Sequence, residues 1–76
     1  MLIEPGDFIK VVFKNEESGE SERMWLKVER ADSAARIVFG ALDSEPVANP
    51  DLYRGMQLAV SYDNICEHMK EAAFNQ

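Results

Sequence analysis

The sequence has little of the chemistry from which metal sites, disulfides and phosphate-binding loops are built. Its 76 residues include one cysteine, Cys66, and one histidine, His68. A single cysteine cannot close an internal disulfide, and the two residues cannot supply all the nitrogen and sulfur ligands of a structural zinc site. The four glycines are widely spaced, so no glycine-rich loop is present to hold a phosphate group. We therefore expect neither a metal ion nor a cofactor.

Basic side chains and long apolar runs are scarce as well. The chain carries 8 Lys and Arg against 14 Asp and Glu, which gives a net charge of −6. Proteins that bind nucleic acids cluster basic residues to displace counterions, so this balance argues against DNA or RNA as a partner. No apolar run approaches a transmembrane span, and residues 1–6 lack the features of a secretory signal. These absences predict a cytoplasmic protein that does not contact a membrane.

What is present is the composition of one small globular domain. Apolar residues make up 46% of the chain, and 76 residues provide for only one hydrophobic core. Four segments alternate between apolar and polar residues with a period of two, which predicts half-buried β-strands at residues 8–13, 23–29, 36–42 and 56–62. Residues 1–76 are therefore expected to form a single, mainly β domain.

The alternation also predicts which side chains form the core. The inward faces of the first, second and fourth strands are expected to carry Ile9, Val11, Phe13, Met24, Leu26, Val28, Met56, Leu58, Val60 and Tyr62. The connections are polar or contain proline. Residues 15–22 form a predicted solvated hairpin loop with four carboxylates, and residues 43–55 form a longer loop with a short helical turn expected at residues 49–53.

The C-terminal segment changes its period. Ile65, Met69 and either Ala72 or Ala73 recur at helical spacing after a capping residue, Asp63 or Ser61, which predicts a short helix packed on the sheet. The expected fold is mainly β with one C-terminal helix. The sheet would be a small, strongly curved antiparallel sheet or an SH3-like barrel of four to five strands, with a flat sheet-plus-helix arrangement as the alternative. A fifth strand is expected near Leu2 or within residues 43–55.

No catalytic residue is assigned from the sequence. A nucleophile needs a neighbouring base, and Cys66 with His68 is the only such pair. On the predicted helix these two residues would point roughly 200° apart, so the thiol and the imidazole could not meet. The sequence therefore favours a protein that is not an enzyme.

Two candidate binding surfaces follow from the pattern. Phe8, Val12, Trp25 and Lys27, together with Lys10, share the outer face of the first two strands and predict a docking surface for a partner protein. The alternative is that the predicted C-terminal helix or the loop of residues 43–55 covers this face as a second small core.

The second candidate surface is the loop of residues 43–55. Its polar residues Asp51, Tyr53 and Arg54 are candidate contacts for a small ligand. A homo-oligomer that pairs an exposed strand edge is a further possibility.

Three segments together resemble a family of small uncharacterised bacterial domains. They are MWLKV at residues 24–28, VFGALDSEPV at residues 38–47, and LYRG at residues 52–55 leading into LAVSYDNI at residues 58–65. That family has an MWV-type strand, an LDNxP-like turn and a GD-x-V strand leading into an Asp-x-Ile helix start. In this chain Ser44 and Glu45 replace the usual pair of the turn, and Met56 stands where an acidic residue is common. The family has no assigned catalytic residues, so the resemblance implies no site.

The function that the sequence favours is a non-catalytic protein-interaction module with an acidic surface, for which a basic protein is a candidate partner. Some small acidic bacterial domains neutralise basic toxins, and the resemblance allows such a role. The alternatives are a small-molecule-binding domain or weak enzyme that uses residues 43–55, and a structural subunit of a homo-oligomer.

Overall fold

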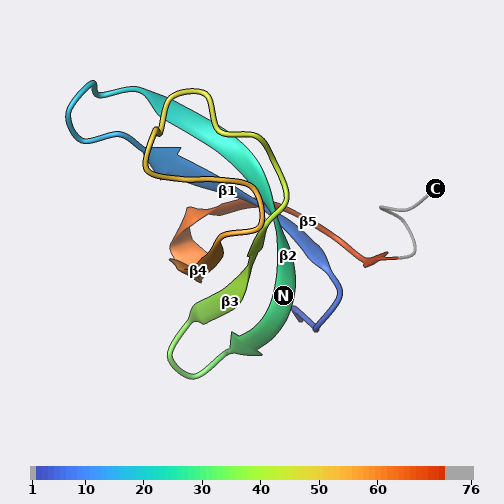
Figure 1. Cartoon of the computed structure of the whole chain (residues 1–76). Coiled ribbons are helices and arrows are strands. Elements are labelled where there is room, and N and C mark those ends of the chain that lie inside the picture. Colours follow the sequence, from blue (N-terminus) through green and yellow to red (C-terminus); the bar gives the residue numbers. More distant parts are fainter. Residues whose placement is uncertain (1, 72–76) are drawn as a thin grey trace.

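The computed structural model describes residues 2–71, which form one antiparallel sheet of five strands (Figure 1). The strands follow the sheet order β4-β3-β2-β1-β5, and a 3₁₀ turn, η1 (Tyr62–Asn64), joins β4 to β5. Their bounds are β1 (Phe8–Lys14), β2 (Ser21–Asp32), β3 (Ile37–Leu42), β4 (Gln57–Ser61) and β5 (Ile65–Met69). The prediction of a mainly β fold is confirmed, and β1 to β4 lie within two or three residues of the predicted segments.

The core lies on the inner face of the curved sheet. The predicted inward residues of β1 and β2 are buried there, except Phe13, which is partly buried. The cluster is completed by Ile3, by Val38 and Leu42 of β3, by Val60 of β4 and by Tyr62 of η1. The alternation of β-strand side chains therefore predicted the faces of β1 and β2 correctly.

Two irregularities and one glycine let the sheet bend. The pairing of β2 with β3 shifts between Val28 and Arg30, and the pairing of β1 with β5 shifts between Lys10 and Val11. Such bulges increase the local twist of a strand. Gly40 of β3 packs against β2 so closely that a Cβ atom there would lie 2.3 Å from the carbonyl oxygen of Lys27. The long β2 consequently curves through the centre of the sheet (Figure 1).

The sheet is open, so the prediction of a closed SH3-like barrel is wrong. Within residues 2–71, β4 pairs only with β3, and β5 pairs only with β1. The ladder between β1 and β5 covers Phe8 to Val11, which leaves the last three residues of β1 without a partner strand on that side. In the same part of the chain, no helix is long and apolar enough to cross a membrane.

The predicted C-terminal helix is wrong over the residues that the structure describes. Ser61 caps the 3₁₀ turn by accepting a hydrogen bond from the Asp63 N–H at 3.1 Å, and β5 begins directly afterwards at Ile65. Ile65 and Met69 are spaced four residues apart, which fits a strand as well as a helix. The strand is favoured over the helix because it pairs with the free edge of β1, where backbone N–H and C=O groups of both strands form hydrogen bonds. Ala72 and Ala73 lie outside the described residues.

We expect the burial of Leu26 to dominate the stability of the sheet. Leu26 is fully buried, so Leu26→Ala should lower the free energy of unfolding by about 3 kcal/mol. Ser33→Ala, in the exposed turn between β2 and β3, is the control and should change it by less than about 0.5 kcal/mol. Urea unfolding monitored by circular dichroism measures both values. Equal midpoints for the two variants would contradict the assignment of Leu26 to the core.

Candidate functional site

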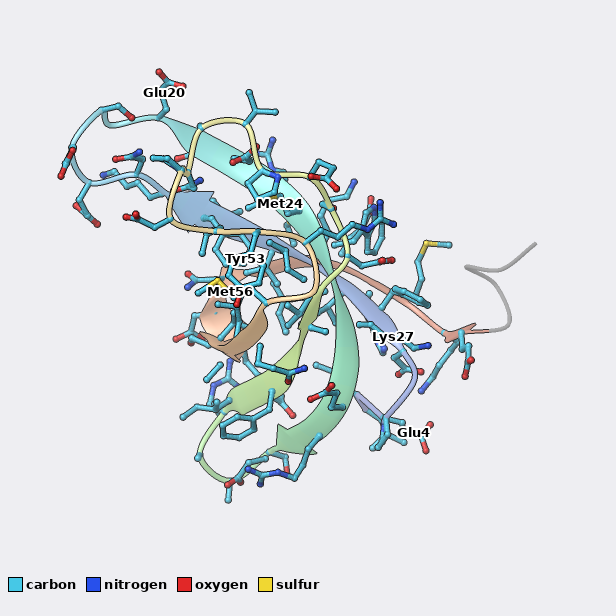
Figure 2. All side chains as sticks on the ribbon, viewed as in Figure 1. Glu4, Glu20, Met24, Lys27, Tyr53 and Met56 are labelled. Atoms are coloured by element: carbon cyan, nitrogen blue, oxygen red, sulfur yellow. The ribbon has the colours of Figure 1, made fainter. Side chains whose placement is uncertain are left out.

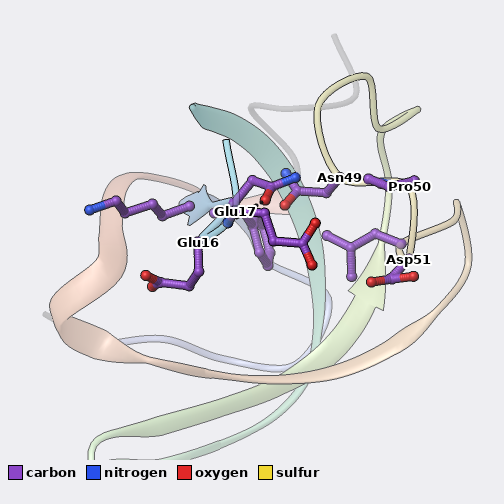
Figure 3. Close-up of a pocket in the computed structure, with 9 residues that line it drawn as sticks. Glu16, Glu17, Asn49, Pro50 and Asp51 are labelled. Carbon is purple, nitrogen blue, oxygen red and sulfur yellow. Dashed lines mark hydrogen bonds between the residues drawn. The ribbon is translucent and has the colours of Figure 1, made fainter. Parts of the chain in front are cut away.

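A cavity of about 370 Å³ lies between the β1–β2 hairpin and the loop of residues 43–56 that connects β3 to β4 (Figure 3). We call this loop the proline loop, because it contains Pro46 and Pro50, and we call the cavity the acidic cavity. The hairpin and the loop face each other across it. The residues that line it are Phe13, Lys14, Asn15, Glu16, Glu17, Asn49, Pro50, Asp51 and Leu52.

The proline loop is held in place by one carboxylate of β2. Glu22 accepts hydrogen bonds from the backbone N–H groups of Val47 at 2.7 Å and Ala48 at 3.1 Å. It also accepts one from the side-chain amide of Asn49 at 2.9 Å. Proline removes backbone donors and is disfavoured inside a ladder, so this loop cannot be anchored by regular strand pairing. The three bonds to Glu22, which we call the Glu22 clamp, replace that pairing.

Two further contacts position the loop beside the hairpin. Asn15 donates a side-chain hydrogen bond to the carbonyl oxygen of Ala48 at 2.8 Å. Its side-chain oxygen accepts from the N–H of Glu17 at 2.9 Å, which shapes the turn that carries the acidic residues. At the start of the loop, Ser44 Oγ accepts from the Trp25 N–H at 2.9 Å. Asn15 therefore joins both walls of the acidic cavity.

The Glu22 clamp lowers the pKa of its own carboxyl group. The hydrogen bond from Asn49 is the largest cause, and the bonds from the N–H groups of Val47 and Ala48 act in the same direction. Partial burial acts against them and is outweighed. The clamp is consequently made by an ionised carboxylate at neutral pH.

The acidic cavity is lined by three carboxylates that belong to none of the ion pairs of residues 2–71. Glu16, Glu17 and Asp51 line it, and none of the ion pairs among residues 2–71 includes them. Lys14 is the single basic residue in the lining. Glu20 lies nearby at the tip of the hairpin, at the opposite end of the molecule from Glu4 (Figure 2).

The structure brings only one of the three predicted ligand-loop residues to the cavity. Asp51 lines it, whereas Tyr53 and Arg54 do not. Tyr53 is 63% exposed. Arg54 forms an exposed ion pair with Asp43 at 3.4 Å. Of the three residues predicted to contact a small ligand, only Asp51 therefore lies at the cavity.

The predicted docking surface on β1 and β2 is partly covered. Phe8 is 5% exposed and Trp25 is half-buried. The ammonium group of Lys27 lies 5.8 Å from the centre of the Phe8 ring, and that of Lys10 lies 5.0 Å from a ring of Trp25. Val12 is half-buried. These residues share a face as predicted, but Phe8 is not accessible to a partner in this structure.

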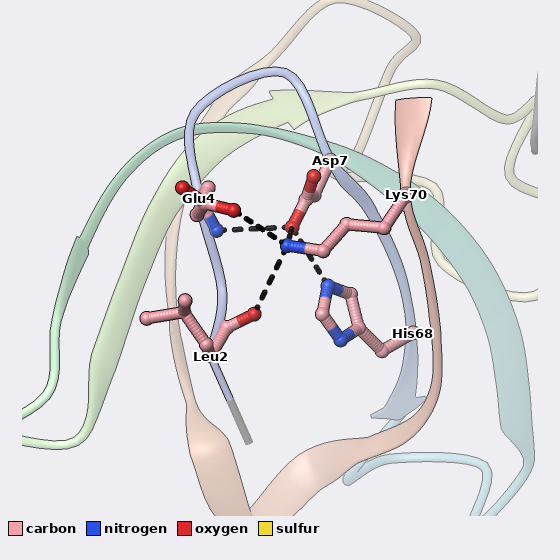
Figure 4. A network of polar contacts seen from close by, with 5 residues as sticks. All are labelled: Leu2, Glu4, Asp7, His68 and Lys70. Carbon is pink, nitrogen blue, oxygen red and sulfur yellow. Dashed lines mark hydrogen bonds and ion pairs between the residues drawn. The ribbon is translucent and has the colours of Figure 1, made fainter. Parts of the chain in front are cut away.

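A second polar cluster ties the N-terminal segment to the end of β5 (Figure 4). Asp7 is 4% exposed, and its Oδ2 lies 2.8 Å from His68 Nε2 and 3.1 Å from Lys70 Nζ. It also accepts from the Glu4 N–H at 3.0 Å, and Lys70 pairs with Glu4 at 2.8 Å. Burial raises the pKa of Asp7, but the hydrogen bonds from His68, Glu4 and Lys70 outweigh it and hold that pKa below its usual value. Within residues 2–71, the partners of the Asp7 side chain, namely Glu4, His68 and Lys70, all belong to this cluster, which we call the N-terminal staple, so the role of this carboxylate is structural.

The geometric argument that separated Cys66 from His68 was wrong, because both residues lie on a strand and not on a helix. Residues two apart on a regular strand point to the same side. They are nevertheless engaged elsewhere. The Cys66 thiol donates to the carbonyl oxygen of Lys10 at 3.4 Å, while His68 binds Asp7. Over residues 2–71, no group of three or more His, Cys, Asp or Glu residues is arranged to hold a metal ion.

Sequence reasoning missed the two carboxylates with the most hydrogen bonds. It treated Glu22 as one of four equivalent acids on a solvated loop, but Glu22 belongs to β2 and clamps the proline loop. Asp7 received no role, although it is the buried acid of the N-terminal staple. The position of Glu22 at the start of an alternating strand, on the same side as Met24 and Leu26, was a signal that could have set it apart.

Comparison of the chain with protein-family models, curated proteins and solved structures found no match. The resemblance to a family of small bacterial domains therefore stays a prediction.

Replacing the clamp carboxylate should loosen the proline loop without unfolding the sheet. Glu22→Gln leaves one acceptor oxygen and places an amide donor against the N–H groups of the loop, which should cost about 1 kcal/mol of stability. Glu20→Gln, at the exposed hairpin tip, is the matched control. Hydrogen exchange of the Val47 and Ala48 amides should accelerate only in the Glu22 variant. Equal exchange rates in both variants would contradict the clamp.

The clamp should also weaken in acid. The pKa of Glu22 is lowered by folding, so its stabilising contribution is present above its unfolded pKa of about 4.3 and is lost as the pH falls through the folded value. The amide chemical shifts of Val47 and Ala48 should titrate together, with a midpoint below about pH 4.3. In the Glu22→Gln variant, the amide shifts of Val47 and Ala48 should show no such titration.

Proposed function

We propose that this protein binds a positively charged segment of a partner protein in the acidic cavity and that it acts without catalysis. The observation that carries the proposal is the position of Glu16, Glu17 and Asp51 around one cavity, with no basic partner among the described ion pairs. Carboxylates in this situation attract a Lys or Arg side chain from outside the chain.

Negative charge is concentrated around the acidic cavity. Five acids elsewhere take part in ion pairs in the described part of the chain, namely Glu4, Asp7, Asp43, Asp63 and Glu67. Around the acidic cavity, three carboxylates are opposed by one ammonium group, that of Lys14. The local net charge is therefore −2, which complements a cationic segment.

The lining of the cavity also fits the long side chains of Lys and Arg. Phe13, Pro50 and Leu52 contribute apolar surface beside the carboxylates. The methylene groups of a Lys or Arg side chain pack on apolar surface, while its charged end reaches outward to an acid. The cavity combines both kinds of contact within about 370 Å³.

Removing the cavity carboxylates should weaken the binding of a cationic peptide. The variant Glu16→Gln/Glu17→Gln/Asp51→Asn should reduce the affinity for acetylated octalysine amide about tenfold, because each charge contributes up to about 1 kcal/mol. A control with the same loss of charge at exposed acids that do not line the cavity and belong to none of the described ion pairs is Glu29→Gln/Glu45→Gln/Glu71→Gln. Titration calorimetry at two salt concentrations measures the effect, and binding to the wild type should weaken with salt.

Amide chemical shifts identify where the peptide binds. Octalysine should shift the amides of residues 13–17 and of Asn49, Asp51 and Leu52 in the wild type, and octaglutamate should shift none of them. If the two triple variants bound octalysine equally well, or if the shifts were spread over the whole surface, the proposal would be rejected.

A further inference from the structure

We infer that the basic partner segment binds as an added β-strand along the free edge of β4, in the open seam between β4 and β1, with one end in the acidic cavity. This inference rests on the proposed function and names the conformation of the bound segment. Strand addition to an exposed sheet edge is a common mode of peptide recognition, in which backbone hydrogen bonds provide affinity.

The seam is a second cavity, of about 540 Å³. Its walls include residues 11–14 of β1 on one side and residues 59–61 of β4 on the other. It shares Phe13, Lys14 and Glu16 with the acidic cavity. A segment lying in the seam therefore reaches the acidic cavity without crossing any other element.

The backbone of β4 presents free hydrogen-bonding groups along its outer edge. The Met56 carbonyl oxygen accepts from the Leu42 N–H at 2.9 Å, and the Tyr62 N–H donates to the Arg36 carbonyl oxygen at 3.0 Å. Backbone groups of successive residues point to opposite sides of a strand, so even-numbered residues of β4 face β3. Gln57, Ala59 and Ser61 consequently turn their N–H and C=O groups away from β3. No other strand of residues 2–71 pairs with this edge.

The same argument applies to the end of β1. The Asp7 carbonyl oxygen accepts from the Val28 N–H at 2.8 Å, and the Asn15 N–H donates to the Glu20 carbonyl oxygen at 2.8 Å. Odd-numbered residues of β1 therefore face β2, and Val12 and Lys14 direct their backbone groups to the other side. Because β5 pairs only as far as Val11, these groups border the seam.

The edge of β4 lacks the features that usually prevent strand addition. Native edge strands are protected by charged side chains, proline or bulges. The β4 sequence QLAVS contains no charge and no proline, and its pairing with β3 is regular. A strand can therefore add to it without burying a charged group of β4.

The charges near the seam specify a cationic occupant. Glu16 lies where the seam meets the acidic cavity, and Glu17 and Asp51 lie beyond it in the same direction. Lys14 borders the seam as well and is the one opposing charge in its lining. A segment that alternates apolar and basic residues fits both regions, because its apolar side chains face Val60 and Phe13 while its basic end meets the carboxylates.

Hydrogen exchange with a defined peptide tests the inference on the unmodified protein. Acetyl-(Val-Lys)₄-amide should slow the exchange of the Ala59 and Ser61 amides, which face the seam. The amides of Leu58 and Val60 face β3 and should change little. Unchanged exchange at Ala59 and Ser61 in the saturated complex would overturn the inference.

A pair of variants at one position tests the backbone contact directly. Ala59→Pro removes the seam-facing N–H at a position of an edge strand where proline is tolerated, and it should weaken binding of the Val-Lys peptide about fivefold or more. Ala59→Val keeps the N–H and should bind as the wild type does. Equal binding by both variants, with circular dichroism spectra like that of the wild type, would overturn the inference.

The outcomes separate this inference from the proposed function. If the cavity triple variant loses peptide binding while Ala59 and Ser61 stay unprotected, the proposed function stands and strand addition is rejected. If these amides are protected equally in wild type and triple variant, the charge-based function is rejected. If protection appears without peptide as the protein concentration rises, together with a doubled mass in sedimentation, a second copy occupies the edge and the inference is overturned.

Discussion

The ionised carboxylate of Glu22 is the contact on which the binding region depends. It gathers three donors from Val47, Ala48 and Asn49 of a loop whose prolines prevent regular pairing. Without this acceptor on β2, residues 43–56 would lose three of the hydrogen bonds that hold them beside the hairpin and would keep the bond from Asn15 to Ala48 and those between Trp25 and the start of the loop. The hydrogen bonds from loop to clamp are charge-assisted, and such bonds are among the stronger ones in proteins. One side chain at the start of β2 thus determines where the proline loop lies.

The strands of this fold were largely predictable from local alternation, but the fifth strand was not. The buried residues Ile9 and Val11 of β1 and Met24, Leu26 and Val28 of β2 recur at every second position, so the core-facing side of both strands follows from the order of residues alone. The segment from Ile65 to Met69 has only five residues, too few to distinguish a period of two from one of 3.6. Its conformation is determined by a distant partner, the unpaired edge of β1. Pairing between segments more than fifty residues apart leaves no local pattern to read.

In the candidate site, too, the features that depend on neighbouring residues were predictable, and those that depend on distant contacts were not. The acidic character of the hairpin was evident from residues 15–22, and Asp51 was a predicted contact that does line the cavity. What the sequence does not show is that Glu22 differs from Glu16, Glu17 and Glu20. The four residues are chemically identical, and only a loop that lies 25 or more residues away along the chain turns Glu22 into an anchor. The three others are left to face solvent and the cavity.

In the binding that we propose, selectivity comes from the different roles of the carboxylates. Backbone groups at a free strand edge can pair with almost any extended chain, so edge pairing alone discriminates poorly between partners. Charges act over about 8 Å at physiological salt, which means that a cluster of acids attracts a partner more effectively than the same charge spread over the surface. In this protein, five acids elsewhere take part in ion pairs, whereas Glu16, Glu17 and Asp51, which line the cavity that meets the open edge, belong to none of the ion pairs of residues 2–71. In the binding mode that we propose, these three acids select a cationic segment, and the uncharged edge of β4 then binds its backbone.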